Sequence, residues 1–291
     1  MTAGEHLAAV GRRPRRLVLD DRGFLDAPRW HDGLLWCSDM GRRQVLAVDP
    51  GGALQRVIDT PGRPGGLGWL PDGGLLVVLM DERVIVRWSP AGFREHADLR
   101  PVLRAAANDM VVDARGNAYV TGYGYDAATE SPRPTRIVRV DGSGRVHVQP
   151  GDLLRPNGCV LNADGTVLVV AETRVHRLSR FAVGGDGRLS GHEVWSVLPR
   201  GSWADGIAMD DHGGVWVGDP KGRRCYYVDP EGTPHPVIDT SPYACVACEI
   251  GGPDGSELYL LLGDLAAMAG DGRAHVPARI ESVSIGPEST L

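Results

Sequence analysis

The chain repeats one short pattern six times, and this repeat constrains its fold more than any other feature of the sequence. Each copy has an apolar strand, a turn rich in Asp and Gly, and a second apolar strand. The turn glycines are spaced 40, 43, 49, 48 and 42 residues apart, a period typical of four-stranded propeller blades. The copies are RWHDGLLWCSDM at 29, GWLPDGGLLVVLM at 68, MVVDARGNAYVTGY at 110, CVLNADGTVLVVAE at 159, IAMDDHGGVWVGD at 207 and EIGGPDGSELYLLLG at 249.

Two more β-rich runs follow each of the first five copies, such as QVLAVDP and LQRVIDT after the first. The sixth copy is followed by RIESVSI alone, so we expect RLVLD at 16–20 to supply its outer strand and close the ring. The sequence therefore predicts an all-β, six-bladed β-propeller over residues 16–291, with a central metal site, after an N-terminal extension at 1–15. A β-sandwich also has many short strands, but it does not require six evenly spaced copies of one hairpin.

Composition agrees with a β-rich fold and excludes several classes of protein. The 291 residues include 40 Gly and 21 Pro, as expected where the chain turns often, and 42% are hydrophobic. A net charge of −6 argues against a nucleic-acid partner, and we expect the basic run GRRPRR at 11–16 to be solvated. No apolar run has the length of a membrane span, and the N-terminus does not resemble a secretory signal. We therefore expect a cytoplasmic protein without membrane partners.

Five cysteines without a secretory signal predict reduced thiols rather than disulfides. CVAC at 245–248 has the spacing of redox and zinc sites, but no second pair of Cys or His completes a zinc site. These cysteines are therefore interpreted as small buried residues.

Comparing the repeats selects one position in each blade, seven or eight residues before the turn glycine. The first strands line the channel of a propeller, so these positions predict a ring around one end of it. Four of them carry oxygen and two, Gly66 and Cys248, do not. Each of the four is an ordinary turn or loop residue by itself, but their shared register favours a metal or substrate site. The four oxygen-bearing residues are Asp26, Asn108, Asn157 and Asp205.

Two carboxylates in one channel repel each other unless a proton or a cation lies between them. Asp and Asn oxygens suit a hard divalent cation, so one ion is predicted here, with Ca²⁺ favoured and Mg²⁺, Mn²⁺, Zn²⁺ or Fe²⁺ as the other candidates. The second strands return toward this end, which predicts a rim of side chains around a small-molecule substrate. Glu172 is interpreted either as a substrate contact or as an exposed charge. The predicted rim is Met80, Tyr123, Tyr125, Glu172 and Asp219, with Trp203 in the wall.

With these residues in view, the chain resembles the SMP-30/gluconolactonase/LRE family, also called the regucalcin family. The motifs that carry the resemblance, in order, are DAPRWHDGLLWCSDM, GRPGGLGWLPDGGLLVV, NDMVVDARGNAYV, PNGCVLNADG and ADGIAMDDHGGVWV. The resemblance implies a six-bladed propeller with one catalytic divalent cation, and sugar-lactone hydrolysis in many members. It also implies that Asp26, Asn157 and Asp205 bind the cation and that Asn108 contacts the substrate.

Two positions depart from the family pattern. Asp26 stands where the family has Glu, and it is one methylene shorter. Ala106 stands where many sugar-lactone hydrolases of the family have Arg, and Arg104 cannot be assumed to replace it. A less polar ester or lactone is therefore considered beside the sugar lactones.

These observations predict a metal-dependent hydrolase that opens a lactone or related ester, with the metal polarising the carbonyl and Asp205 as general base. The chain has no G-x-S-x-G elbow, so a serine hydrolase is not expected. A non-hydrolytic cyclase or isomerase using the same cation is the alternative, and a binding propeller with a structural metal ranks third. The substrate's identity and the oligomeric state stay open.

Overall fold

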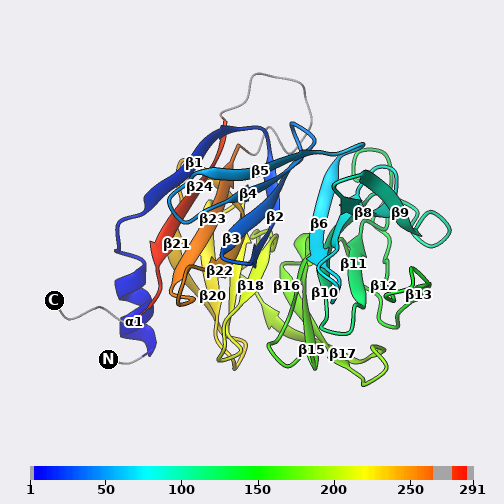
Figure 1. The fold of residues 1–291 in the computed structure, drawn as a ribbon. Coiled ribbons are helices and arrows are strands. Elements are labelled where there is room, and N and C mark those ends of the chain that lie inside the picture. The colour runs from blue at the N-terminus through cyan, green and yellow to red at the C-terminus, as the bar shows by residue number, and fades with distance from the viewer. Residues whose placement is uncertain (1–2, 265–276, 287–291) are drawn as a thin grey trace.

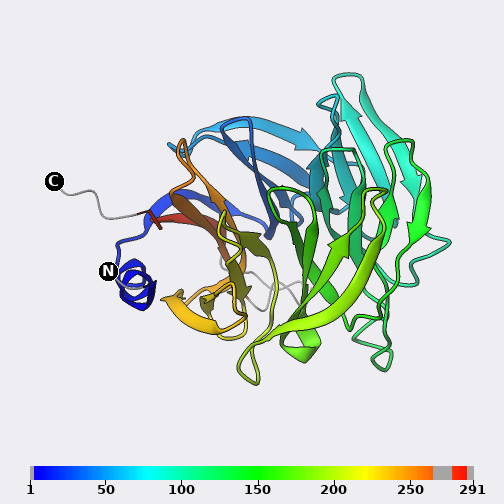
Figure 2. The same ribbon diagram turned by 90° about the horizontal axis from the view of Figure 1, so that it is seen from below.

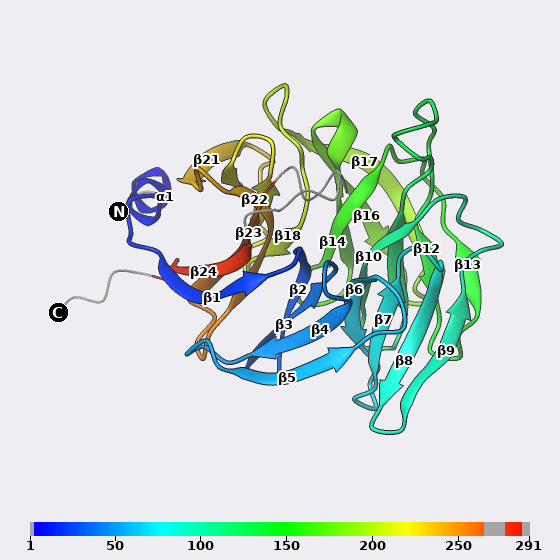
Figure 3. The ribbon, with the colours of Figure 1, turned by 90° about the horizontal axis from the view of Figure 1, so that it is seen from above.

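In a computed structural model of the chain, which describes residues 3–264 and 277–286, six four-stranded sheets form a ring (Figure 1). Neighbouring strands within each sheet are antiparallel. The first strands of the sheets surround the centre and the last strands lie outside, as seen from above in Figure 3. The predicted six-bladed β-propeller is therefore confirmed. The predicted propeller range also included residues 265–276 and 287–291, which lie outside the described part of the chain.

The blades follow one another along the chain, and each uses four strands from the channel outward. Blades 1 to 3 comprise β2 (Leu25–His31), β3 (Leu34–Asp39), β4 (Gln44–Val48), β5 (Leu54–Asp59); β6 (Pro64–Trp69), β7 (Leu75–Leu79), β8 (Val84–Ser89), β9 (Gly92–Asp98); and β10 (Ala107–Val112), β11 (Ala118–Gly122), β12 (Val138–Val140), β13 (Val146–Val148). Blades 4 to 6 comprise β14 (Pro156–Leu161), β15 (Val167–Glu172), β16 (Arg177–Val183), β17 (Leu189–Val197); β18 (Ile207–Met209), β19 (Val215–Asp219), β20 (Arg224–Val228), β21 (Pro234–Asp239); and β22 (Ala244–Gly251), β23 (Glu257–Gly263), β24 (Ala278–Ser284), β1 (Arg16–Arg22).

The repeated turn joins the first two strands of every blade. Its glycine has a φ between 68° and 86° in all six copies, a region that side chains with a Cβ rarely occupy. This conformational requirement explains why glycine recurs at a fixed place in each repeat.

The hydrophobic core lies between the blades and is divided into six clusters, each shared by two neighbouring sheets. Strand β7 shows how one strand serves two clusters. Val77 packs toward blade 1 with Ala47, whereas the next residue, Val78, packs toward blade 3 with Met110. Alternate side chains of a strand point to opposite faces, so each blade is buried on both sides.

The two ends of the chain meet in blade 6, where β1 pairs with β24 through the registers Arg16↔Ser282 and Leu17↔Glu281. The predicted closure of the ring by the strand at 16–20 is therefore confirmed (Figure 1).

The N-terminal extension contains one helix, α1 (Ala3–Val10), which lies outside the ring beside β21 (Figure 2). Val10 at its end is buried in the core cluster between blades 5 and 6. The basic run after the helix is not wholly solvated as expected, because Arg13 donates hydrogen bonds to the carbonyls of Ser284 and Gly286 at 2.9 and 2.7 Å. The extension is thus packed against blades 5 and 6.

All five cysteines are buried and free, as the sequence predicted. Cys225, Cys245 and Cys248 share one core cluster. Within residues 3–264 and 277–286, no helix combines the length and the apolar character needed to cross a membrane.

Candidate active site

A cavity of about 1140 Å³ opens at the end of the channel where the first strands begin. Its lining includes all four residues that the register of the repeats selected. Asp26, Asn108 and Asn157 are each the second residue of an inner strand, and Asp205 lies just before β18. The other two register positions do not line the cavity, and Cys248 points into the core between blades 5 and 6.

Glycines allow neighbouring blades to approach closely behind this ring. Gly158 follows Asn157, and its N–H donates to the carbonyl of Asp205 at 3.2 Å. A Cβ at Gly158 would lie 2.5 Å from that carbonyl oxygen, so a larger residue would push blades 4 and 5 apart. The N-G and D-G dipeptides of the motifs are therefore needed for packing between blades as well as for turning the chain.

A chain of hydrogen bonds orients the amide side chains of Asn108 and Asn157. Asn108 Nδ2 donates to Asn157 Oδ1 at 2.7 Å, and Asn157 Nδ2 donates to Thr173 Oγ1 at 3.2 Å. Thr173 in turn donates to the carbonyl of Ala204 at 2.8 Å. This sequence of donors fixes Asn157 with its oxygen toward Asn108 and its nitrogen away from it.

Burial and neighbouring negative charges disfavour the ionised forms of Asp26 and Asp205. Burial, together with the charge of Asp109, raises the pKa of Asp26 to about 7, and the N–H of Ala27 at 2.7 Å partly opposes the rise. Burial and then the charge of Asp26 raise the pKa of Asp205 well above its usual range. Asp205 is 1% exposed, and its Oδ2 has no hydrogen-bond partner within the described residues. An unpartnered buried oxygen is costly unless something else binds it.

The chemistry of these donors fits a hard divalent cation. Such a cation would offset the negative charges of the two carboxylates and would bind the Asp205 oxygen that has no hydrogen-bond partner. Amide oxygen from Asn157 and water would complete the shell, and among the described residues no His or Cys lines the cavity. Across residues 3–264 and 277–286 no group of three acidic, His or Cys side chains is placed to hold a metal, since this ring supplies only two.

A buried charge network next to the ring was not predicted from the sequence. Asp109 Oδ1 accepts hydrogen bonds from Arg29 Nη2 at 2.8 Å and from the Met110 N–H, while its Oδ2 accepts one from the Cys159 N–H at 3.1 Å. Asp109 thus connects blade 3 to blades 1 and 4. Arg29 and Asp109 both lie inside motifs that suggested the family. A contact between residues 80 positions apart, however, leaves no pattern in the local sequence.

The predicted rim is placed only in part around the cavity. Met80, Tyr123, Tyr125 and Trp203 line it. Glu172 does not: its side chain is fully buried in blade 4, where it accepts hydrogen bonds from Arg177, Ser179 and the Leu154 N–H. Glu172 is therefore neither the cavity-lining substrate contact nor the exposed charge that were predicted as alternatives, because the strand-end side chain turns into the blade.

Asp219 is also buried away from the cavity, and its Oδ1 accepts hydrogen bonds from the N–H groups of Trp203 and Gly222. The hydrogen bond to Asp219 holds the backbone of Trp203, which lines the cavity.

Burial raises the pKa of Tyr123 to about 12, so its hydroxyl stays protonated near neutral pH.

One cavity wall comes from an unusually long connection. Strands β11 and β12 are joined by residues 123–137, whereas the matching connections in blades 1, 2, 4 and 5 are the four-residue segments 40–43, 80–83, 173–176 and 220–223. The long segment brings the stretch 126–130 to the cavity beside Ala105 and Ala106. Arg104 also lies there, but it is exposed and its guanidinium lies 3.9 Å from Glu130.

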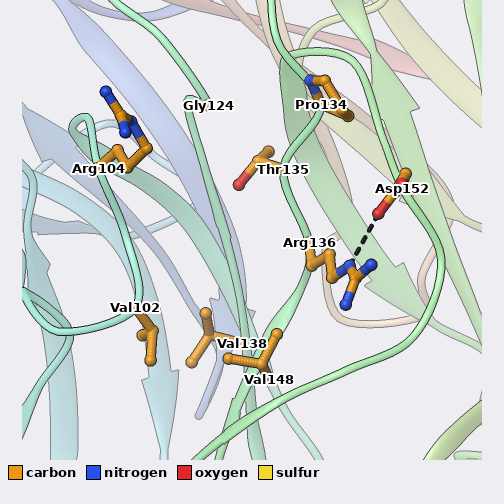
Figure 4. A pocket seen from close by; sticks show the side chains of 9 residues that line it. All are labelled: Val102, Arg104, Gly124, Pro134, Thr135, Arg136, Val138, Val148 and Asp152. Atoms are coloured by element: carbon orange, nitrogen blue, oxygen red, sulfur yellow. Dashed lines mark hydrogen bonds and ion pairs between the residues drawn. The ribbon is translucent and has the colours of Figure 1, made fainter.

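A second pocket, of about 350 Å³, lies on blade 3 (Figure 4). Its charged residues Arg136 and Asp152 form an ion pair with each other at 2.7 Å, and both side chains are more than half exposed. None of the described residues that line this pocket has a buried, unpartnered polar group, so the channel cavity is the better candidate.

Comparison with known proteins agrees with this fold. The family model described as SMP-30/Gluconolactonase/LRE-like region matches residues 25–263. A 6-deoxy-6-sulfogluconolactonase from Pseudomonas putida is 24% identical over 264 residues, covering 88% of this chain and 86% of that protein. A gluconolactonase structure from Xanthomonas campestris has a TM-score of 0.75 at 19% identity, covering 97% of this chain and 93% of the other. The calcium-binding protein regucalcin from Agrobacterium tumefaciens also has a TM-score of 0.75 at 19% identity, with 96% and 97% covered.

Proposed function

Because the chain belongs to the SMP-30/gluconolactonase/LRE-like family, we propose that it is a hydrolase that opens a lactone or a related ester with the help of one divalent cation. The observation that carries the proposal is the ring of two buried carboxylates and two amides in one cavity, with Asp205 Oδ2 left without a partner. Relatives named as lactonases support the reaction class.

Asp26, Asn157 and Asp205 would hold the cation, for which Ca²⁺ is the first choice because all the donors are oxygens. When bound, the cation would polarise the substrate carbonyl and offset the charge of the two carboxylates. A relative named as a calcium-binding protein agrees with this choice.

Asp205 would act as the general base. A water proton would pass to the Asp205 carboxylate while the water oxygen attacks the carbonyl carbon, and the ring C–O bond would then break. The proton goes to the leaving alkoxide, so the product is a hydroxy acid that contains one added water. Asn108, held by Asn157, would orient the substrate oxygen, and Tyr123, Tyr125 and Trp203 would form the apolar wall.

A non-hydrolytic cyclase or isomerase is the second candidate. It is favoured by Ala106, which leaves the cavity without a guanidinium at that position, and by the aromatic wall. A binding propeller with a structural cation is the third, and it predicts that no small molecule is converted.

A lactone panel tested with cation-stripped protein separates these functions. Ca²⁺, Mg²⁺, Mn²⁺, Zn²⁺ and Fe²⁺ are restored one at a time, and product masses are measured. We expect hydrolysis with at least one cation, a mass gain of one water, and a loss of about 100-fold or more in kcat/KM for Asp205→Asn. The control Asp32→Asn makes the same change in an exposed turn of blade 1 and should keep full activity. Inactivity of the whole panel with all five cations would overturn the proposal.

A further inference from the structure

Resting on the proposed function and extending it to the substrate, we infer that the substrate of the channel cavity carries an oxyanion, such as a carboxylate, sulfonate or phosphate, and that Arg155 binds it. Arg155 lines the cavity two residues before Asn157, at the start of β14. A charged group on the lactone would thus lie close to the predicted cation ligands.

The position of the Arg155 guanidinium suits anion binding. Its central carbon lies 3.9 Å from the ring centroid of Tyr123 and 5.9 Å from that of Tyr125. Stacking on an aromatic face holds a guanidinium flat and leaves the N–H groups at its edge available. Two parallel N–H donors match the two oxygens of a carboxylate or related group.

The guanidinium is not occupied by the protein. Within the described residues its N–H groups have no hydrogen-bond or ion-pair partner, although Arg155 is only half-buried and faces the cavity. Asp126 also lines the cavity, and the pKa of its carboxyl is lowered first by the Ala128 N–H and in small part by Arg155. Two other arginines of the same cavity, Arg63 and Arg83, are paired. Arg63 lies 2.6 Å from Asp81, and Arg83 donates to the Leu103 carbonyl at 2.9 Å.

A second unpaired guanidinium reinforces the positive charge of this side of the cavity. Arg174 follows the end of β15, which pairs with the start of β14, and the Thr173 N–H donates to the Arg155 carbonyl at 3.2 Å. Arg174 lies 5.6 Å from the Trp203 ring centroid and Lys221 lies 5.5 Å from it. Neither cation has a carboxylate partner in the described part of the chain.

The backbone also holds Arg155 in an unfavourable conformation. Its φ is 52°, a region that costs a residue with a Cβ about 1 kcal/mol or more.

An alternative role for the Arg155 side chain is to offset the Asp205 charge, since Arg155 lowers the pKa of that carboxyl in part. A bound divalent cation would perform that role, and the positive charge of Arg155 would then be available to the substrate.

The test compares two lactones that differ in one group. γ-Carboxy-γ-butyrolactone carries a carboxylate where γ-valerolactone carries a methyl group. With saturating cation, we expect Arg155→Gln to raise KM for the carboxylate lactone by about 10-fold to 100-fold, and to change KM for γ-valerolactone by less than about 3-fold. Arg155→Lys should fall between Arg155→Gln and the original protein, because it keeps the charge but loses the planar fork. The control Arg188→Gln removes the same charge at an exposed site outside the cavity and should change neither value.

Binding of inert lactams separates failure of this inference from failure of the proposed function. Pyroglutamate and its γ-methyl lactam analogue have the same two substituents but an amide in place of the ester, and their affinities are measured by calorimetry. If no lactone is hydrolysed but pyroglutamate binding still requires Arg155, the hydrolase proposal is wrong and the anion site stands. If Arg155→Gln affects both lactones and both lactams equally, the anion site is wrong even where hydrolysis is found. Inhibition by acetate, methanesulfonate and methyl phosphate then ranks the three oxyanions.

Discussion

Asp205 is needed for the proposed function, but its buried carboxyl should destabilise the cation-free protein. Its Oδ2 is buried without a hydrogen-bond donor, and its charge lies near that of Asp26. Without a cation, Asp205→Asn should therefore stabilise the protein by about 1 kcal/mol or more, because it removes the cost of burying a carboxyl whose pKa is raised well above its usual range. Urea unfolding in the presence of a chelator checks this, with Asp32→Asn as the matched change in an exposed turn. If Asp205→Asn lowers stability under these conditions, Asp205 is satisfied by a partner other than a cation.

Cation binding should depend on pH through the same two carboxyls. The pKa of Asp26 is about 7 in the folded protein but ordinarily 3.8. The folded state therefore keeps a proton that the unfolded state loses, so the stability of the cation-free protein falls as pH rises from about 4 to about 7. A cation competes with that proton, and its affinity should rise over the same range. Calorimetric titration with Ca²⁺ between about pH 5 and about pH 8 measures the slope, which Asp26→Asn should reduce.

At the scale of strands, the repeat pattern predicted more than single residues could. The recurring glycine marked the same turn in every blade, and counting back from it placed Asp26, Asn108 and Asn157 at equivalent strand starts. Glu172 shows where such counting fails. Side chains alternate along a strand, so a strand-end residue can face the channel or the blade interior, and only packing decides between them.

Contacts across blades were beyond prediction for a different reason. Arg29 and Asp109 are 80 residues apart, and Arg155 reaches from blade 4 to Tyr123 in blade 3. Such contacts depend on side-chain rotamers and on how neighbouring sheets are rotated relative to each other, and neither has a periodic signal in the sequence. The ring of oxygen-bearing side chains was predictable because backbone symmetry alone brings it together.

The Asp109 network should contribute to stability through its links to blades 1 and 4. Asp109→Ala removes the ion-pair partner of buried Arg29, whose side chain is 14% exposed, and should cost about 3 to 5 kcal/mol in the free energy of unfolding. Adding Arg29→Met should restore part of that loss, because the guanidinium that lost its Asp109 partner is then removed as well. Urea unfolding of the two single variants and the double variant measures the coupling. Additive losses would show that the ion pair does not connect the blades energetically.

At the scale of the whole molecule, the six shared core clusters make each blade depend on both neighbours. Closure of the ring by β1 therefore affects more than blade 6. Val18 of β1 is buried in the cluster between blades 6 and 1, beside Leu46 of blade 1 and Tyr259 of blade 6. A destabilising change there should reach distant blades if the ring unfolds as one unit.

The buried thiols allow this cooperativity to be measured. Val18→Asp places a charge in the core and should lower the free energy of unfolding by about 3 kcal/mol or more, while Val57→Asp on the exposed face of the outer strand β5 should change it little. Thiol labelling at increasing urea reports the opening of blade 4 through Cys159 and of blade 6 through Cys245. If the ring is one cooperative unit, both thiols of Val18→Asp react in a single transition at a lower urea concentration than in the original protein. Reaction of Cys245 well before Cys159 would instead mean that blade 6 opens alone, and that ring closure stabilises only the blade that it completes.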